Sequence, residues 1–203
     1  VLVKDIEPGT VGSNPSDLIN FNGTLYFTAT TTSNGNELWK SDGTEAGTQL
    51  VKDINVLGTG GSPSGLTVMG THFYFGAFTD ANGYELWKSD GTNAGTQLVK
   101  DINPGTASSI YSDFMPVNGS IYFNAITATH GVELWKSDGT NAGTQLVQDI
   151  NPGTASSTPS SITNVNGTLF FTALQGGQTQ LMKTDGTGAG TMAINSSIFG
   201  GGT

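Results

Sequence analysis

The chain has 203 residues, a formal net charge of -9 and a charged fraction of only 11%. All seven basic residues are lysine, and this acidic, arginine-free composition excludes nucleic acid as a partner. There is no cysteine, so disulfides, thiolate metal sites and cysteine nucleophiles are excluded as well. No apolar run approaches the length of a membrane span, and we therefore predict no membrane insertion.

A tandem repeat organises the sequence. The tetrapeptide Glu-Leu-Trp-Lys begins at Glu37, Glu85 and Glu133, 48 residues apart each time, and a divergent copy begins at Gln180. A fixed period of this length is typical of architectures in which one unit cannot bury its apolar face alone. We predict one domain over residues 1–203, which divides into 1–6 (fourth strand of a preceding or closing blade), 7–54, 55–102, 103–150 and a degenerate repeat at 151–203.

Short β runs alternate with turn residues in every unit, and the third unit shows the order best. Runs at 113–117 and 120–125 flank an Asn-Gly pair, which readily adopts the positive φ angles of a type I′ hairpin turn. A third run at 132–136 ends at Ser-Asp-Gly-Thr, and a fourth follows at 144–150. Four antiparallel strands per unit, without a sustained helical period, indicate an all-β fold.

Tandem four-stranded units of this length predict a β-propeller with four blades, arranged as a small ring. The second strand of every unit carries large apolar side chains on both faces, as a blade packed between two neighbours requires. We predict that these side chains fill the spaces between blades: Trp39, Trp87, Trp135 and, in the last unit, Met182. A β-sandwich or a solenoid built from the same strands is the alternative.

The two ends of the chain are out of register with the repeat. Residues 1–6 match a fourth strand whose unit lacks its first three strands, whereas the C-terminal counterpart after Thr191 has lost the Lys-Asp pair. We predict that the N-terminal strand completes the last blade, in the same ring or in a neighbouring molecule by strand donation. The alternative is a segment cut from a longer array, with neighbouring repeats as partners. The strand concerned is Val1, Leu2, Val3, Lys4, Asp5 and Ile6.

The segments that begin at Glu37, Glu85 and Glu133 read Glu-Leu-Trp-Lys-Ser-Asp-Gly-Thr, and Ala-Gly-Thr follows one residue later. They resemble the ELWxxDGT repeat family, which is common in large bacterial surface and secreted proteins. The resemblance covers nearly the whole chain and implies a propeller-like extracellular module. The fourth unit departs from the motif, with Met182 and Thr184 at the Trp and Ser places.

Most acidic residues recur at repeat positions, which favours structural roles over catalysis. We predict that one set accepts backbone N–H bonds in the Asp-Gly-Thr turn: Asp42, Asp90, Asp138 and Asp185. We also predict that Glu37 and its counterparts pair with lysines such as Lys52 across strands.

Calcium is the one cofactor that the sequence offers. Asp80, Asn82 and Glu85 place three oxygen-bearing side chains within six residues, although the spacing is not that of an EF-hand and the other units do not preserve the Asp. No other metal site or cofactor is predicted.

No nucleophile elbow or Ser-His-acid set is present, so we predict that the chain is not an enzyme. The first hypothesis is a non-catalytic, extracellular structural or adhesive module that self-assembles head to tail into a filament by N-terminal strand donation. The alternative is a lectin-like propeller that holds surface glycans on Trp or Tyr faces.

Overall fold

The computed structural model describes residues 2–56, 60–110 and 114–194. These residues form four antiparallel sheets of four strands each, and the predicted all-β propeller of four-stranded blades is confirmed. No helix in the described part of the chain is long and apolar enough to cross a membrane.

Each blade is a meander whose strands pair in chain order. Blade 1 contains β1 (Ser16–Phe21), β2 (Thr24–Thr31), β3 (Gly35–Ser41) and β4 (Gln49–Lys52). Blade 2 contains β5 (Ser64–Met69), β6 (His72–Thr79), β7 (Gly83–Ser89) and β8 (Gln97–Lys100). Blade 3 contains β9 (Met115–Val117), β10 (Ser120–Thr127), β11 (Gly131–Ser137) and β12 (Gln145–Gln148). Blade 4 contains β13 (Ser160–Val165), β14 (Thr168–Gln175), β15 (Gln178–Thr184) and β16 (Met192–Ala193).

The first hairpin of blades 1, 3 and 4 closes with the predicted Asn-Gly turn. Asn22 and Gly23 have φ values of 52° and 81°, and the turns at Asn118 and Asn166 are also left-handed. Positive φ at both central residues gives a type I′ turn the same twist as the strands it joins. The turn therefore sets the register in which Phe21 faces Thr24.

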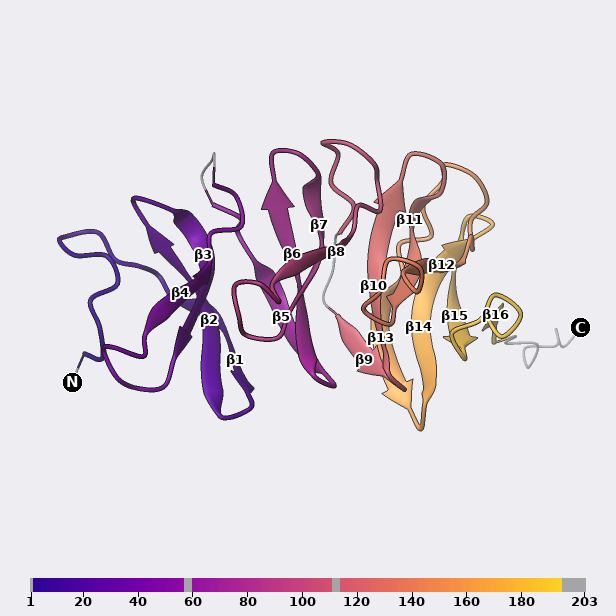
Figure 1. Cartoon of the computed structure of the whole chain (residues 1–203). Coiled ribbons are helices and arrows are strands. Elements are labelled where there is room, and N and C mark those ends of the chain that lie inside the picture. Colours follow the sequence, from indigo (N-terminus) through magenta and orange to yellow (C-terminus); the bar gives the residue numbers. More distant parts are fainter. Residues whose placement is uncertain (1, 57–59, 111–113, 195–203) are drawn as a thin grey trace, which may run out of the picture.

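The four blades lie side by side in a row, with blade 1 and blade 4 at opposite ends (Figure 1). Neighbouring blades meet along their first strands, since β1 contacts β5, β5 contacts β9 and β9 contacts β13. The predicted small ring is therefore wrong: the described blades form an open row. Large apolar side chains pack the three internal joints, and no cluster of buried side chains joins blade 4 to blade 1 in the described residues.

The hydrophobic core lies between blades. At the first joint Tyr26 and Leu38 of blade 1 meet Phe73 and Trp87 of blade 2. The Tyr26 and Phe73 ring centroids are 4.9 Å apart, a separation at which aromatic pairs attract. Trp135 and Met182 fill the second and third joints in the same way, as predicted, whereas Trp39 lies in no joint and packs with Ile6 and Phe27 on the outer side of blade 1. We call the face that receives a preceding blade upstream and the opposite face downstream.

Residues 2–6 form no strand and remain on blade 1. Ile6 packs against Phe27 and Trp39, as Ile54 packs against the equivalent side chains of blade 2. The predicted closure of the ring in cis is therefore wrong, because these contacts hold the segment at the upstream face of blade 1, far from blade 4 (Figure 1). Val1 lies outside the described residues.

Candidate functional site: the two end faces of the blade row

Every blade carries the same turn after its third strand. Asp42 Oδ1 accepts bonds from the Thr44 N–H at 2.9 Å and from the Thr44 hydroxyl at 2.7 Å. The other three turns repeat both bonds, as predicted. The hydrogen bond from the threonine hydroxyl has the largest effect and that from the N–H the next largest, and both lower the pKa of each aspartate. We call this element the Asp-Gly-Thr turn: residues 42–44, 90–92, 138–140 and 185–187.

The preceding blade contacts this turn at every internal joint. The hydroxyls of Tyr26, Tyr74 and Tyr122 lie against the turn glycines, and a Cβ on any of these glycines would overlap the hydroxyl. The glycines are Gly91, Gly139 and Gly186, with φ between 88° and 90°. The pKa of each of the three tyrosines is raised, mainly by burial and to a smaller extent by the negative charge of the turn aspartate. Glycine is thus required for two reasons: the backbone has a positive φ, and the tyrosine hydroxyl occupies the space that a Cβ would need.

Lysines of the preceding blade bind the same turn. Lys88 Nζ donates to the Gly139 carbonyl at 2.8 Å, and Lys136 Nζ donates to the Gly186 carbonyl at 2.7 Å. Lys100 Nζ adds a bond to the Thr144 carbonyl at 2.9 Å. Sequence reasoning missed these joint contacts, although the repeat holds a signal: Tyr26, Tyr74 and Tyr122 recur 48 residues apart, and a lysine follows each of them 14 residues later.

The repeated glutamates do not pair with lysine. Glu37 is completely buried and accepts the N–H groups of Ile54 at 3.0 Å and Gly61 at 2.6 Å, whereas Lys52 Nζ reaches the Asn93 carbonyl of blade 2. The predicted Glu–Lys pair is therefore wrong, because the carboxylate turns inward to hold the crossing between blades. Desolvation raises the pKa of all three glutamates above their ordinary value.

Glu85 shows the largest effect of this burial. Its carboxylate accepts the Ile102 N–H at 2.9 Å and the Ser109 hydroxyl, and desolvation raises its pKa to about 7. The hydrogen bonds act in the opposite direction but do not offset the loss of water.

The calcium candidates do not share one set of contacts. Glu85 is directed at Ile102 and Ser109, while the Asn82 amide donates to Asp101 Oδ2 at 3.0 Å. Asp80 is exposed. No group of three acidic or histidine side chains suited to a metal ion occurs in the described ranges. Calcium at this loop stays a prediction that these contacts do not support.

The upstream face of blade 1 is incompletely covered. Leu18 is 61% exposed and Leu25 is 37% exposed, whereas their equivalents in blade 2, Leu66 and Phe73, are buried under blade 1. A cavity of about 310 Å³ opens there, lined by residues 2–4 together with Ile6, Leu18, Leu25 and Phe27 among others. Gly43 of the local Asp-Gly-Thr turn is exposed, with nothing near the place of a Cβ.

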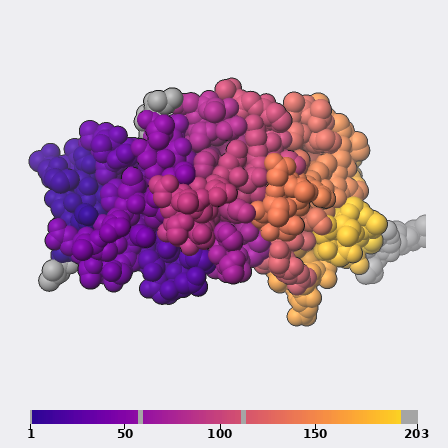
Figure 2. All heavy atoms as spheres, in the orientation of Figure 1, coloured from indigo at the N-terminus to yellow at the C-terminus, as the bar shows by residue number. Residues whose placement is uncertain are grey.

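The downstream face of blade 4 is uncovered in the same manner. Val165 is 48% exposed and Leu181 is 50% exposed, whereas Val117 and Leu134, which hold these positions in blade 3, are buried in the third joint. Lys183 is exposed, and Phe170 replaces the joint tyrosine and is partly exposed. Figure 2 shows blade 1, in indigo to purple, and blade 4, in orange to yellow, at the two ends of an elongated molecule.

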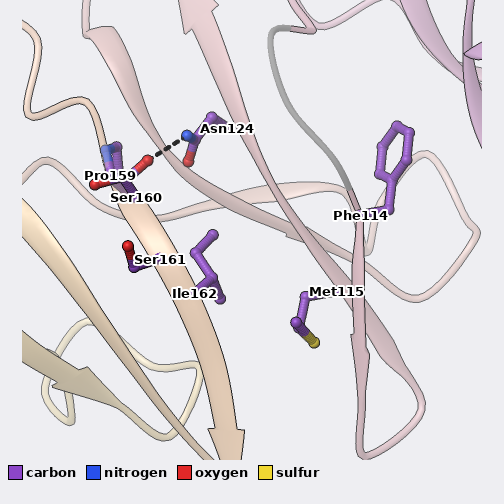
Figure 3. Close-up of a pocket in the computed structure, with 7 residues that line it drawn as sticks. All are labelled: Phe114, Met115, Asn124, Pro159, Ser160, Ser161 and Ile162. Atoms are coloured by element: carbon purple, nitrogen blue, oxygen red, sulfur yellow. Dashed lines mark hydrogen bonds between the residues drawn. The ribbon is translucent and has the colours of Figure 1, made fainter. Parts of the chain in front are cut away.

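A further cavity of about 380 Å³ opens between blades 3 and 4 (Figure 3). The Asn124 amide crosses it to donate to the Pro159 carbonyl at 2.6 Å. The described lining combines apolar and hydroxyl groups and holds no acid, lysine or histidine, so it offers no group for proton transfer. The lining residues are Phe114, Met115, Asn124, Pro159, Ser160, Ser161 and Ile162.

Five aromatic rings that the lectin alternative would use are covered. Trp39, Trp87, Trp135, Tyr26 and Tyr74 are all buried. These rings therefore do not support glycan binding, whereas Tyr84 is partly exposed, and the lectin alternative stays a prediction.

No family model matches the sequence, and no curated protein gives a significant match. Solved structures share the fold. A puromycin hydrolase S511A mutant complexed with PGG matches with a TM-score of 0.53 and 14% identity, over 90% of this chain and 28% of that one. A putative TolB from Agrobacterium tumefaciens matches with a TM-score of 0.51 and 12% identity, over 85% of this chain and 61% of that one. This chain thus spans less than two thirds of either structure.

The first of these matches corrects one prediction. The prediction that the chain is not an enzyme, which rests on the lack of a nucleophile elbow and of a Ser-His-acid set, is wrong, because a hydrolase shares the same fold. At 14% identity this likeness establishes the fold alone. A Bacteroides ovatus xyloglucan-locus protein named GH43B also matches, with 15% identity over 85% of this chain and 38% of that one, but its TM-score of 0.42 carries no argument.

Proposed function

We propose that this chain is a structural or adhesive module, exported to the outside of a bacterial cell, that associates head to tail with further copies of itself. One observation carries the proposal: the upstream face of blade 1 and the downstream face of blade 4 expose apolar side chains at positions that every internal joint buries. A second copy would cover both kinds of face at once. The resemblance of the repeats to the ELWxxDGT family supports the location outside the cell.

The joint includes residues 2–6 as a donated strand. Lys4 Nζ already donates to the Thr48 carbonyl at 2.8 Å, the bond that Lys100 of blade 2 makes to Thr144 of blade 3. The segment therefore lies where the fourth strand of a preceding blade would lie. In an arriving blade 4 that place is held by the short strand β16, which pairs with Met182 and Lys183, and by Ile194, whose N–H donates to the Leu181 carbonyl at 2.8 Å. The donated strand takes the place of Ile194 beside Leu181.

The donated strand has a defined partner residue. In blade 1 the Cα partner of Leu38 is Lys52, and the equivalents in the joint are Leu181 of the arriving copy and Lys4 of the receiving copy. Because the two faces differ, the contact is heterologous, and repetition gives a filament unless the rotation closes a ring.

Cysteine cross-linking tests the proposal in a chain that has no cysteine of its own. A variant with both Lys4→Cys and Leu181→Cys is expected to give a ladder of covalent oligomers after mild oxidation. Each single variant, as the matched control, is expected to give no ladder. Light scattering of the wild-type chain should show a mass that increases with concentration and falls when residues 1–6 are deleted.

Three results would contradict the proposal. A disulfide formed within one chain would point to closure in cis, and a strictly monomeric wild-type chain at high concentration would exclude self-association. Electron microscopy that shows only closed rings would exclude the filament.

A further inference from the structure

We infer that the exposed Asp42-Gly43-Thr44 turn is a socket for one aromatic ring and one ammonium group, which Phe170 and Lys183 of a second copy supply. This inference rests on the proposed head-to-tail association and identifies the contacts that would hold it. It is argued from the three internal joints, in which each turn of this kind is occupied.

The occupied turns set the pattern. Gly91, Gly139 and Gly186 are buried, and each lies against a tyrosine hydroxyl from the blade before it. At the second and third joints a lysine donates to the carbonyl of the same glycine. At these two joints one glycine thus has a tyrosine hydroxyl against its Cα and an ammonium on its carbonyl oxygen.

The turn of blade 1 has the same conformation without the occupants. Gly43 has φ 89°, like Gly91, and Asp42 binds Thr44 as the other turn aspartates bind their threonines. Gly43 is exposed, however, and no atom lies within 4 Å of the place of a Cβ. The socket is therefore formed in advance and does not depend on a neighbour for its shape, which lowers the cost of binding.

Blade 4 carries the matching groups on its uncovered side. Lys183 follows Met182 as Lys136 follows Trp135, and it is exposed, whereas Lys88 and Lys136 are partly buried at their joints. Phe170 is Cα partner to Lys183, as Tyr26 is to Lys40 in blade 1. The ring and the ammonium therefore stand in the same arrangement as in the internal joints.

One difference sets the strength of this contact. Phe170 has no hydroxyl, so the arriving ring lacks the group that lies beside the turn aspartate at the internal joints. An ammonium bonded to a carbonyl contributes more than a neutral hydrogen bond does. Lys183 is accordingly the main polar contact, and the joint between copies is weaker than the joints within one chain.

Two substitutions test the socket in opposite directions, with sedimentation velocity over a concentration series as the measurement. Phe170→Tyr restores the missing hydroxyl and is expected to lower the dissociation constant about threefold to tenfold. Lys183→Gln removes the ammonium and is expected to raise it by about tenfold or more. The matched controls act at an internal joint: Tyr74→Phe removes a ring hydroxyl there, and Lys88→Gln removes an ammonium. Both should leave the association constant unchanged.

The outcomes separate the inference from the proposal on which it rests. If wild-type chains associate but neither Phe170→Tyr nor Lys183→Gln alters the dissociation constant, the socket is wrong while head-to-tail association stands. If the controls alter association as strongly as the test variants, the effect arises from blade stability and the socket is equally overturned. If no chain associates at any concentration, both fail.

Discussion

Replacing Glu85 by Gln should abolish much of the dependence of stability on pH. Glu85 is completely buried, and its pKa is raised from 4.5 to about 7 by desolvation. In the unfolded chain the group titrates near its ordinary value, so between these two pH values the folded protein binds a proton that the unfolded chain has released. The free energy of unfolding therefore falls as the pH rises through this interval.

The size of the effect follows from the shift. A change from 4.5 to about 7 corresponds to about 3 kcal/mol of unfolding free energy, present in full at and below pH 4.5 and lost above the folded pKa. Glu37 and Glu133 act in the same direction, since burial raises their pKa values as well. The slope of the wild-type profile thus has three contributors, of which Glu85 is the largest.

Urea denaturation at several pH values from 4.5 to 8 measures the slope. Glu85→Gln is expected to lower stability at pH 4.5, because the amide cannot reproduce every bond of the carboxyl group, and to show a flatter profile up to pH 8. The slope of unfolding free energy against pH is the decisive measurement, since it does not depend on the stability that the substitution itself removes. A variant whose profile runs parallel to that of the wild type would refute the assignment of a raised pKa to Glu85.

The other predictions concern packing and the turns. Gly139→Ala should lower the free energy of unfolding by about 2–4 kcal/mol, because the new Cβ is strained at this φ and overlaps the Tyr74 hydroxyl. Gly43→Ala should lower it by only about 1–2 kcal/mol, because Gly43 has no such neighbour. Equal losses of the two variants in urea denaturation would contradict the joint geometry. Trp87→Ala should cost about 3–5 kcal/mol, since its ring fills the first joint, and a loss below 1 kcal/mol by the same assay would be inconsistent with that burial. Acid titration followed by circular dichroism should show stability lost as the pH falls below 3.8 through the lowered pKa values of the turn aspartates, and Asp138→Ala should weaken this acid limb.

Local features of the chain could be predicted because their causes lie within a few residues. The Asn-Gly pairs require positive φ wherever they join two strands, and Asp42 reaches the Thr44 N–H within its own turn. The spacing of Trp87 from Trp135 likewise indicated that each unit buries the same large ring against a neighbour. Strands, turns and the existence of interblade packing follow from such short-range patterns.

The end faces could not be predicted, because they depend on where one blade stops and how far it turns from the next. Strand proximity predicts a Glu37–Lys52 pair, yet in the folded chain the carboxylate accepts the Ile54 N–H and the lysine reaches the following blade. The contacts of Ile6 with Phe27 and Trp39 also depend on the tertiary structure, and so does the exposure of Gly43 in the unoccupied turn of blade 1. The repeat specified each blade by itself, whereas the angle at the joints decided that four blades form an open row with two unmatched faces.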